Sequence, residues 1–145
     1  VEYSVMLKNI YAIAAGIAHG LGYGDNFQSV LMSHSIREMK LFISKMHKIK
    51  RNINNAVYLW DLLVTGYSVF SRNRMFGNMI GKGYTVKSAQ MEMSMVAEGY
   101  YATESAYKIN LDKGAKTPII NAVYSILYEG KNPKSVFKKL AEKLN

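Results

Sequence analysis

The sequence predicts an all-α, bundle-like helical domain that covers residues 1–145 as a single unit. Only two prolines occur, at positions 118 and 133, so long segments can continue as helices without interruption. Within these segments apolar residues recur with a period of about 3.6, the helical period, and no segment shows the alternation of a strand. Because 49% of the residues are hydrophobic, a chain of this length can bury a substantial core.

Two helices are predicted in the first third of the chain. Apolar positions in residues 7–18 share one helix face, and a glycine-rich stretch at residues 20–24 ends this helix. A second apolar stripe covers residues 27–46 and follows Asp25 or Asn26, either of which can cap a helix N-terminus. The glycine-rich stretch follows a helix rather than a strand, and G-x-G-x-x-G is absent. We therefore interpret it as a helix stop and not as the phosphate loop of a dinucleotide fold.

Local signals define the remaining helices. Residues 52–59 predict a short helical piece, and Ser71 is expected at the start of a longer helix, since apolar residues follow it at helical spacing. Thr85 can cap a helix that runs through residues 91–95, and residues 101–109 predict another. The two prolines suit the first turns of the last two helices, because the N–H groups there have no partner within the helix.

Composition excludes several classes of protein and site. With no cysteine, the chain has neither a disulfide framework nor a thiolate zinc site, which fits a cytoplasmic protein. Its three histidines lack metal-binding spacing, so we expect no metal site. No apolar run reaches the roughly 18 residues of a membrane span, and no secretory signal opens the chain. The formal net charge of +9 suits nucleic acid, an acidic lipid surface or an anionic substrate without choosing among them.

The chemically most informative stretch is residues 61–77, D-L-L-V-T-G-Y-S-V-F-S-R-N-R-M-F-G. A helix that starts at Ser71 would present free backbone N–H groups and the positive end of its dipole. The Arg72 guanidinium beside it fits phosphate oxygens. Together with the Asn73 amide, these groups predict a small anion site. The alternative is an ordinary helix cap followed by solvated arginines.

The motif S-R-N-R-x-F-G, preceded by D-L-x-x-T, resembles the substrate segment of bacterial NAD(P)-dependent glycerol-3-phosphate dehydrogenases. Three further segments resemble the same family in the same order: residues 7–16 its catalytic-lysine helix, residues 96–99 its cofactor-contacting turn and residues 118–130 its closing helix. The resemblance implies the helical C-terminal domain of a two-domain enzyme, whose N-terminal Rossmann domain is absent from this chain. Such an enzyme interconverts sn-glycerol 3-phosphate and dihydroxyacetone phosphate with NAD or NADP, supplies glycerophospholipid synthesis and is a homodimer in the cytoplasm.

The resemblance also implies roles for residues that pattern alone leaves ambiguous. Lys8 would be the catalytic residue, which binds the substrate and donates or accepts the proton at the reacting oxygen. Asp61 would face Lys8 and the substrate hydroxyls, with Thr65 near the same centre. Without the resemblance, Lys8 is a surface lysine whose alkyl stem lies on apolar neighbours, and Asp61 is a helix cap. The family usually has Gly just before the aspartate, whereas this chain has Trp60, so the local backbone or packing must differ.

A second group of residues is implied to hold the phosphate and the cofactor. Ser71, Arg72 and Asn73 would bind the substrate phosphate. Arg72 would also reach the cofactor, together with Val96 and Glu98. From the sequence alone, Glu98 is only a glutamate near a helix end.

Two other functions stay open. One is the helical domain of a different two-domain dehydrogenase, which acts on another hydroxy acid or sugar; the predicted phosphate site argues against it. The other is a basic all-α module that binds nucleic acid, which is less favoured because no helix carries evident base-reading residues. In the leading interpretation, the isolated chain folds but transfers no hydride, because it lacks the dinucleotide-binding domain.

Overall fold

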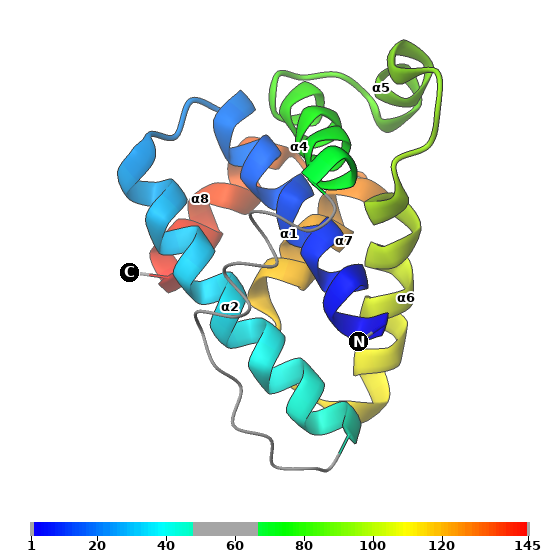
Figure 1. Cartoon of the computed structure of the whole chain (residues 1–145). Coiled ribbons are helices and arrows are strands. Elements are labelled where there is room, and N and C mark those ends of the chain that lie inside the picture. The colour runs from blue at the N-terminus through cyan, green and yellow to red at the C-terminus, as the bar shows by residue number, and fades with distance from the viewer. Residues whose placement is uncertain (1, 48–66, 145) are drawn as a thin grey trace.

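The computed structural model describes residues 2–47 and 67–144. These residues form helices joined by short loops, and none of them forms a strand. The all-α prediction is therefore confirmed, whereas the helical piece expected at residues 52–59 lies outside the described residues. Figure 1 shows the helices, which are α1 (Glu2–Gly20), α2 (Asp25–His47), α4 (Tyr67–Gly81), α5 (Val86–Met93), α6 (Glu98–Lys113), α7 (Pro118–Tyr128) and α8 (Pro133–Leu144).

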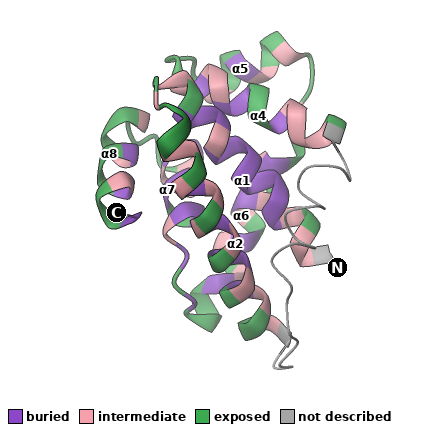
Figure 2. Cartoon of the chain, turned by 60° about the vertical axis from the view of Figure 1, so that its left-hand side comes forward, coloured by how far each residue is buried: buried purple, intermediate pink, exposed green. Residues whose placement is uncertain are grey.

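Helix α1 is the centre of the fold. Helices α2, α4, α6 and α7 all pack against it, so it has neighbours on every side (Figure 1). All residues from 7 to 14 are buried, and Figure 2 shows buried residues along most of the helix. The sequence predicted only one buried face. The difference arises because a helix surrounded by others buries its whole circumference, including its few polar side chains.

Backbone contact brings α1 and α4 unusually close. Each helix supplies two glycines to the crossing, namely Gly16, Gly20, Gly77 and Gly81. A Cβ atom added to Gly16 would lie 2.0 Å from the Arg74 carbonyl oxygen, and one added to Gly77 would lie 2.1 Å from the Ile13 carbonyl oxygen. Since no larger side chain fits, these glycines set the distance between the helices and hold α4 directly against α1.

A buried carboxylate ties α2 to the start of α7. Glu38 is 3% exposed and accepts hydrogen bonds from the backbone N–H groups of Ile119 (2.8 Å) and Ile120 (3.1 Å) and from the Tyr11 hydroxyl (3.0 Å). The Thr117 side chain at the N-cap of α7 forms no capping hydrogen bond, so Glu38 supplies the acceptor from another helix. Burial raises the pKa of Glu38 to about 7, although its three donors oppose the shift.

The local start signals of α5, α7 and α8 are confirmed, whereas α2 already begins at Asp25, so Gly24 rather than Asp25 or Asn26 precedes it, and α5 ends at Met93 instead of running to residue 95. The Thr85 hydroxyl accepts from the Ser88 N–H at 3.0 Å at the start of α5. The Asn132 amide oxygen accepts from the Ser135 N–H at 3.1 Å, and proline is the first residue of both α7 and α8. Helix α6 extends beyond both ends of its predicted range. These starts are local features, which explains why sequence pattern finds them.

Candidate functional site

The predicted site residues that the structure describes lie on helices α1, α4 and α6 and in the loop before α6. Lys8 belongs to α1, Arg72 and Asn73 to α4, and Glu98 is the first residue of α6. Val96 lies two residues earlier, in the loop that leads into α6. Helices α1, α4 and α6 contact each other pairwise, so the fold gathers segments separated by as many as 90 positions of sequence (98 − 8).

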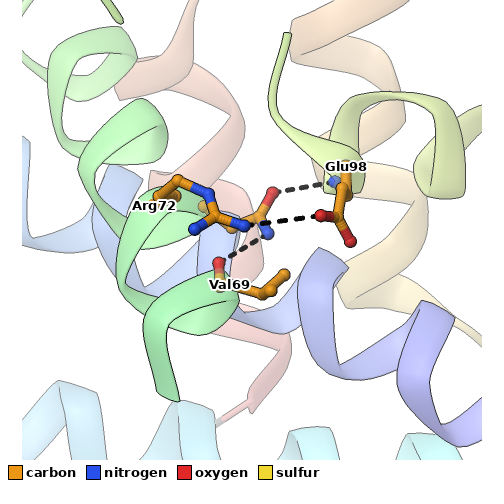
Figure 3. A network of polar contacts seen from close by, with 5 residues as sticks. Val69, Arg72 and Glu98 are labelled. Carbon is orange, nitrogen blue, oxygen red and sulfur yellow. Dashed lines mark hydrogen bonds and ion pairs between the residues drawn. The ribbon is translucent and has the colours of Figure 1, made fainter. Parts of the chain in front are cut away.

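Asn73 joins α4 to the start of α6. It is 1% exposed, and its Oδ1 accepts from the backbone N–H of Gly99 at 2.8 Å. Its Nδ2 donates to the carbonyl oxygen of Val69 at 2.9 Å, which fixes the orientation of the amide (Figure 3). The N-cap residue of α6, Ala97, has no side-chain acceptor. The Asn73 amide therefore satisfies an N–H group of the first turn of α6 that would otherwise be unpaired in a buried place.

Beside this link, Arg72 and Glu98 form an ion pair at the surface. The Arg72 Nη2 lies 3.5 Å from the Glu98 Oε1, and the two side chains are 36% and 55% exposed (Figure 3). An exposed pair at this distance contributes only about 0–1 kcal/mol. The pair is thus a weak contact between two accessible charged groups, and an incoming anion can compete for the guanidinium.

Gly99 is a site residue whose importance the sequence interpretation missed. A Cβ atom here would lie 2.6 Å from both the Asn73 Oδ1 and the Ile13 Cδ1, and 2.9 Å from the carbonyl oxygen of Asn9. Only a hydrogen fits between the three helices at this point. The sequence contains this glycine directly after Glu98, in the V-A-E-G segment. Nothing in the sequence pattern shows, however, that it packs on α1.

Lys8 is buried in α1. It is 7% exposed, and the next residue, Asn9, is 5% exposed and approaches the first turn of α6 through its carbonyl oxygen. The alternative that Lys8 is a surface lysine is wrong, because its neighbours cover the side chain almost completely. Lys8 therefore lies next to the place where α4 and the first turn of α6 both contact α1, which we call the three-helix junction.

The expected position of Ser71 at a helix start is wrong. Helix α4 already includes Tyr67, so Ser71 lies inside it and its backbone N–H is not at the helix end. Consecutive helical residues are rotated by about 100°, so Ser71, Arg72 and Asn73 face three directions and do not converge as the simple anion site assumed. Ser71 instead lines a pocket of about 220 Å³ with His19, Arg74, Met75 and Asn78.

His19 and Asn78 line this pocket together. The His19 Nδ1 and the Asn78 Oδ1 are 2.8 Å apart, which joins the end of α1 to α4. The hydroxyl of Ser71 and the guanidinium of Arg74 are the other polar groups of the wall. The pocket thus offers hydrogen-bond donors, but Arg72 and Asn73 do not line it.

Two predicted substrate contacts, Asp61 and Thr65, lie outside the described residues, as does Trp60. Their roles stay predictions from resemblance. Within residues 2–47 and 67–144 no group of three histidine, cysteine, aspartate or glutamate side chains could hold a metal ion. No helix in the same ranges has the length and apolar character needed to cross a membrane.

Comparisons with known proteins agree on one family. A family model described as "NAD-dependent glycerol-3-phosphate dehydrogenase C-terminus" matches residues 1–138. A protein of Exiguobacterium sp. named glycerol-3-phosphate dehydrogenase (NAD(P)+) is 40% identical over 139 residues, which are 96% of this chain and 41% of the relative. The Bacillus subtilis protein of the same name is 38% identical over 140 residues, 97% of this chain and 41% of the relative.

A solved structure gives the same result for the fold. The crystal structure of a glycerol-3-phosphate dehydrogenase from Coxiella burnetii superposes with a TM-score of 0.84 at 30% identity. The match covers 97% of this chain and 43% of that one. The chain therefore spans about two fifths of the length of the relatives that it matches.

Proposed function

Because the chain belongs to the family of NAD-dependent glycerol-3-phosphate dehydrogenase C-terminal domains, we propose that it is the substrate-binding and catalytic part of such an enzyme. The reaction is the interconversion of sn-glycerol 3-phosphate and dihydroxyacetone phosphate with NAD or NADP. The observation that carries the proposal is the three-helix junction. It combines a buried lysine on α1 with a guanidinium and an amide on α4 and a carboxylate on α6.

Lys8 handles the proton of this reaction. Reduction of the ketone makes an alkoxide, which needs a proton at its oxygen, and the reverse reaction needs a base at the same atom. An ammonium group on a side chain that is 7% exposed meets little competing water and can stay in one orientation. Asp61 and Thr65 complete the site in this proposal, where Asp61 holds Lys8 and the substrate hydroxyls in place.

Arg72 binds the substrate phosphate from the rim of the site. Its guanidinium is accessible, and its contact with Glu98 is long, so phosphate oxygens can replace the carboxylate at small cost. Asn73 is buried and faces a different direction, so it acts on the substrate indirectly, by holding the first turn of α6 and Glu98 beside Arg72 through its bond to the Gly99 N–H. Ser71 faces the separate pocket beside Arg74 and takes no part in this phosphate contact.

The residues of the junction also fit a dinucleotide. Glu98 offers a half-exposed carboxylate that can accept from ribose hydroxyls, and Arg72 offers donors for a pyrophosphate. Val96 adds an apolar contact in the same loop. When bound, the nicotinamide supplies the hydride acceptor or donor. In this proposal the N-terminal Rossmann domain binds most of the cofactor, while this chain holds the substrate phosphate, contacts the cofactor through Arg72, Val96 and Glu98, and moves the proton.

A Rossmann domain of the same protein is the partner that this proposal requires. The family match to a C-terminus supports it, since the relatives are more than twice as long as this chain. We place the enzyme in the cytoplasm, where its product serves phospholipid synthesis. A homodimer is the proposed assembly, and exposed apolar side chains such as Leu111 (68%) and Tyr101 (58%) on α6 provide surface for it.

A fusion enzyme tests the proposal directly. The N-terminal part of the Bacillus subtilis relative is joined to this chain, and reduction of dihydroxyacetone phosphate is followed by the loss of NADH or NADPH absorbance. We expect turnover by the fusion, none by the chain alone, and a large loss of affinity when unphosphorylated dihydroxyacetone replaces the substrate.

Two results would overturn the proposal. One is a folded fusion that prefers an unphosphorylated hydroxy acid or sugar, which would favour a different dehydrogenase. The other is hydride transfer by the isolated 145-residue chain, which would remove the need for a dinucleotide-binding domain.

Substitutions of Lys8 in the fusion enzyme need a matched control. Lys138 is an exposed lysine of α8, so Lys138→Ala serves as that control.

A further inference from the structure

A second pocket lies between α7 and α8 and shares no residue with the junction described above. Its volume is about 260 Å³, and it is open to solvent on one side. Its apolar lining comes from both helices, with Pro118 and Ala122 of α7 and Val136 and Leu140 of α8. Its polar wall consists of Asn121, Ser125, Lys131, Lys139 and Lys143. Nothing in the proposed reaction uses this part of the molecule.

Three lysines concentrate positive charge around this small volume. Lys139 and Lys143 are four residues apart on α8 and share its pocket side, where like charges repel. Lys131 joins them from the α7–α8 loop, which is held in place because its N–H donates to the Ser125 carbonyl oxygen at 3.1 Å. Within residues 2–47 and 67–144, none of the three contacts a carboxylate within 4.0 Å; the ion pairs found there join other residues.

The wall also contains a hydrogen-bond donor with a fixed position. The Asn121 Oδ1 accepts from the Thr117 hydroxyl at 3.1 Å, which identifies the opposite atom of the amide as the nitrogen. That nitrogen carries two N–H groups, and because Asn121 lines the pocket, its amide is a donor available to a bound ligand. The Ser125 hydroxyl donates to the Asn121 carbonyl oxygen at 2.9 Å, so its own oxygen remains an acceptor for a protonated ligand atom.

We propose that this pocket binds a small phosphate-bearing anion, either a soluble phosphomonoester or the phosphate of a lipid headgroup. A phosphate carries close to two negative charges and several acceptor oxygens, which three ammonium groups and an amide can share. A carboxylate would leave most of the positive charge unbalanced. Because the lysines are exposed, each adds little to the binding free energy, so the dissociation constant for a single phosphate is roughly millimolar. The proposal goes beyond the dehydrogenase function and does not rest on it.

Titration of the ¹⁵N-labelled chain with inorganic phosphate at constant ionic strength tests the site by NMR. We expect saturable shifts of the amide signals of Ser125, Lys131 and Lys139, and weaker binding by about tenfold in the double variant Lys139→Gln/Lys143→Gln. The control is Lys134→Gln/Lys138→Gln, which removes two charges from the same helix at positions that do not line the pocket.

These variants distinguish specific binding in the pocket from non-specific electrostatic binding of phosphate to a basic protein. Equal weakening in both double variants, or shifts that spread over the surface without saturation, would overturn the proposal. A second arm compares phosphatidylcholine vesicles with and without phosphatidic acid by sedimentation. Binding that requires phosphatidic acid and the pocket lysines identifies a lipid headgroup as the source, whereas shifts with methyl phosphate but no vesicle binding identify a soluble phosphomonoester.

Discussion

Replacement of Gly99 by alanine tests whether the three-helix junction depends on backbone contact. The new Cβ atom would meet the Asn73 Oδ1 and the Ile13 Cδ1 at 2.6 Å and the Asn9 carbonyl oxygen at 2.9 Å. The Ile13 methyl group can rotate away, but the backbone oxygen cannot, and the Asn73 amide can move only by losing its 2.8 Å hydrogen bond to the Gly99 N–H. The first turn of α6 must therefore shift away from α1 and α4.

The expected cost follows from these contacts. Overpacking in a dense region costs about 1–3 kcal/mol, and a buried N–H that loses its acceptor costs about 1–3 kcal/mol more. Alanine recovers at most about 1 kcal/mol, because glycine is a poor helix residue. We expect Gly99→Ala to lower the free energy of unfolding by roughly 2–4 kcal/mol. This is less than the two costs added at their largest values, because the helices can relax in part and the two costs are not independent.

Urea unfolding monitored by circular dichroism measures this loss, and Gly24→Ala is the matched control. A Cβ atom at Gly24 has no neighbour within 4 Å, so that variant loses only the preference for glycine at the N-cap of α2 and should stay within about 1 kcal/mol of the parent chain. In the fusion enzyme, Gly99→Ala should also weaken cofactor binding, since it displaces Glu98 relative to Arg72. Equal and small effects of the two substitutions on stability would refute the reasoning.

Three further predictions concern charged residues. In the fusion enzyme, Lys8→Ala should lower turnover by about 10² or more, and Lys8→Arg should restore little of it, because a guanidinium keeps its proton; steady-state kinetics that show full rescue by arginine would contradict the proton role. Arg72→Ala should weaken substrate binding by roughly ten- to hundredfold and Arg74→Ala by less, as measured by the KM for dihydroxyacetone phosphate; similar small effects would return Arg72 to an ordinary surface residue. Because the pKa of Glu38 is raised from 4.5 to about 7, the folded state holds a proton that the unfolded state releases, so stability should fall by about 3 kcal/mol as pH rises from below 4.5 to above 7. Urea unfolding at several pH values measures this fall in stability, which should be absent in Glu38→Gln. An equal dependence of stability on pH in the two proteins would refute the role of Glu38.

The sequence by itself determined the helical architecture and several of its boundaries. Helical period, the Thr85 cap and the prolines that open α7 and α8 act within one or two turns, so they can be found without knowledge of the fold. Packing between helices adds to these local signals: Tyr107 of α6 stacks on Tyr124 of α7 with ring centroids 3.7 Å apart. The resemblance singled out Arg72, Glu98 and Lys8 as candidate site residues, and their roles stay predictions.

Only the tertiary structure decided how these residues are arranged. The Asn73 amide reaches the Gly99 N–H across 26 positions, and Glu38 reaches the start of α7 across 81. Local pattern cannot reveal such contacts, because they depend on how closely whole helices approach one another. Ser71 shows the same limit: its place inside α4 follows from where that helix begins, and the rotation between consecutive helical residues then turns it away from Arg72 and Asn73 toward a different pocket. Burial of Lys8 likewise arises because α2, α4, α6 and α7 enclose α1, which no property of that segment alone specifies.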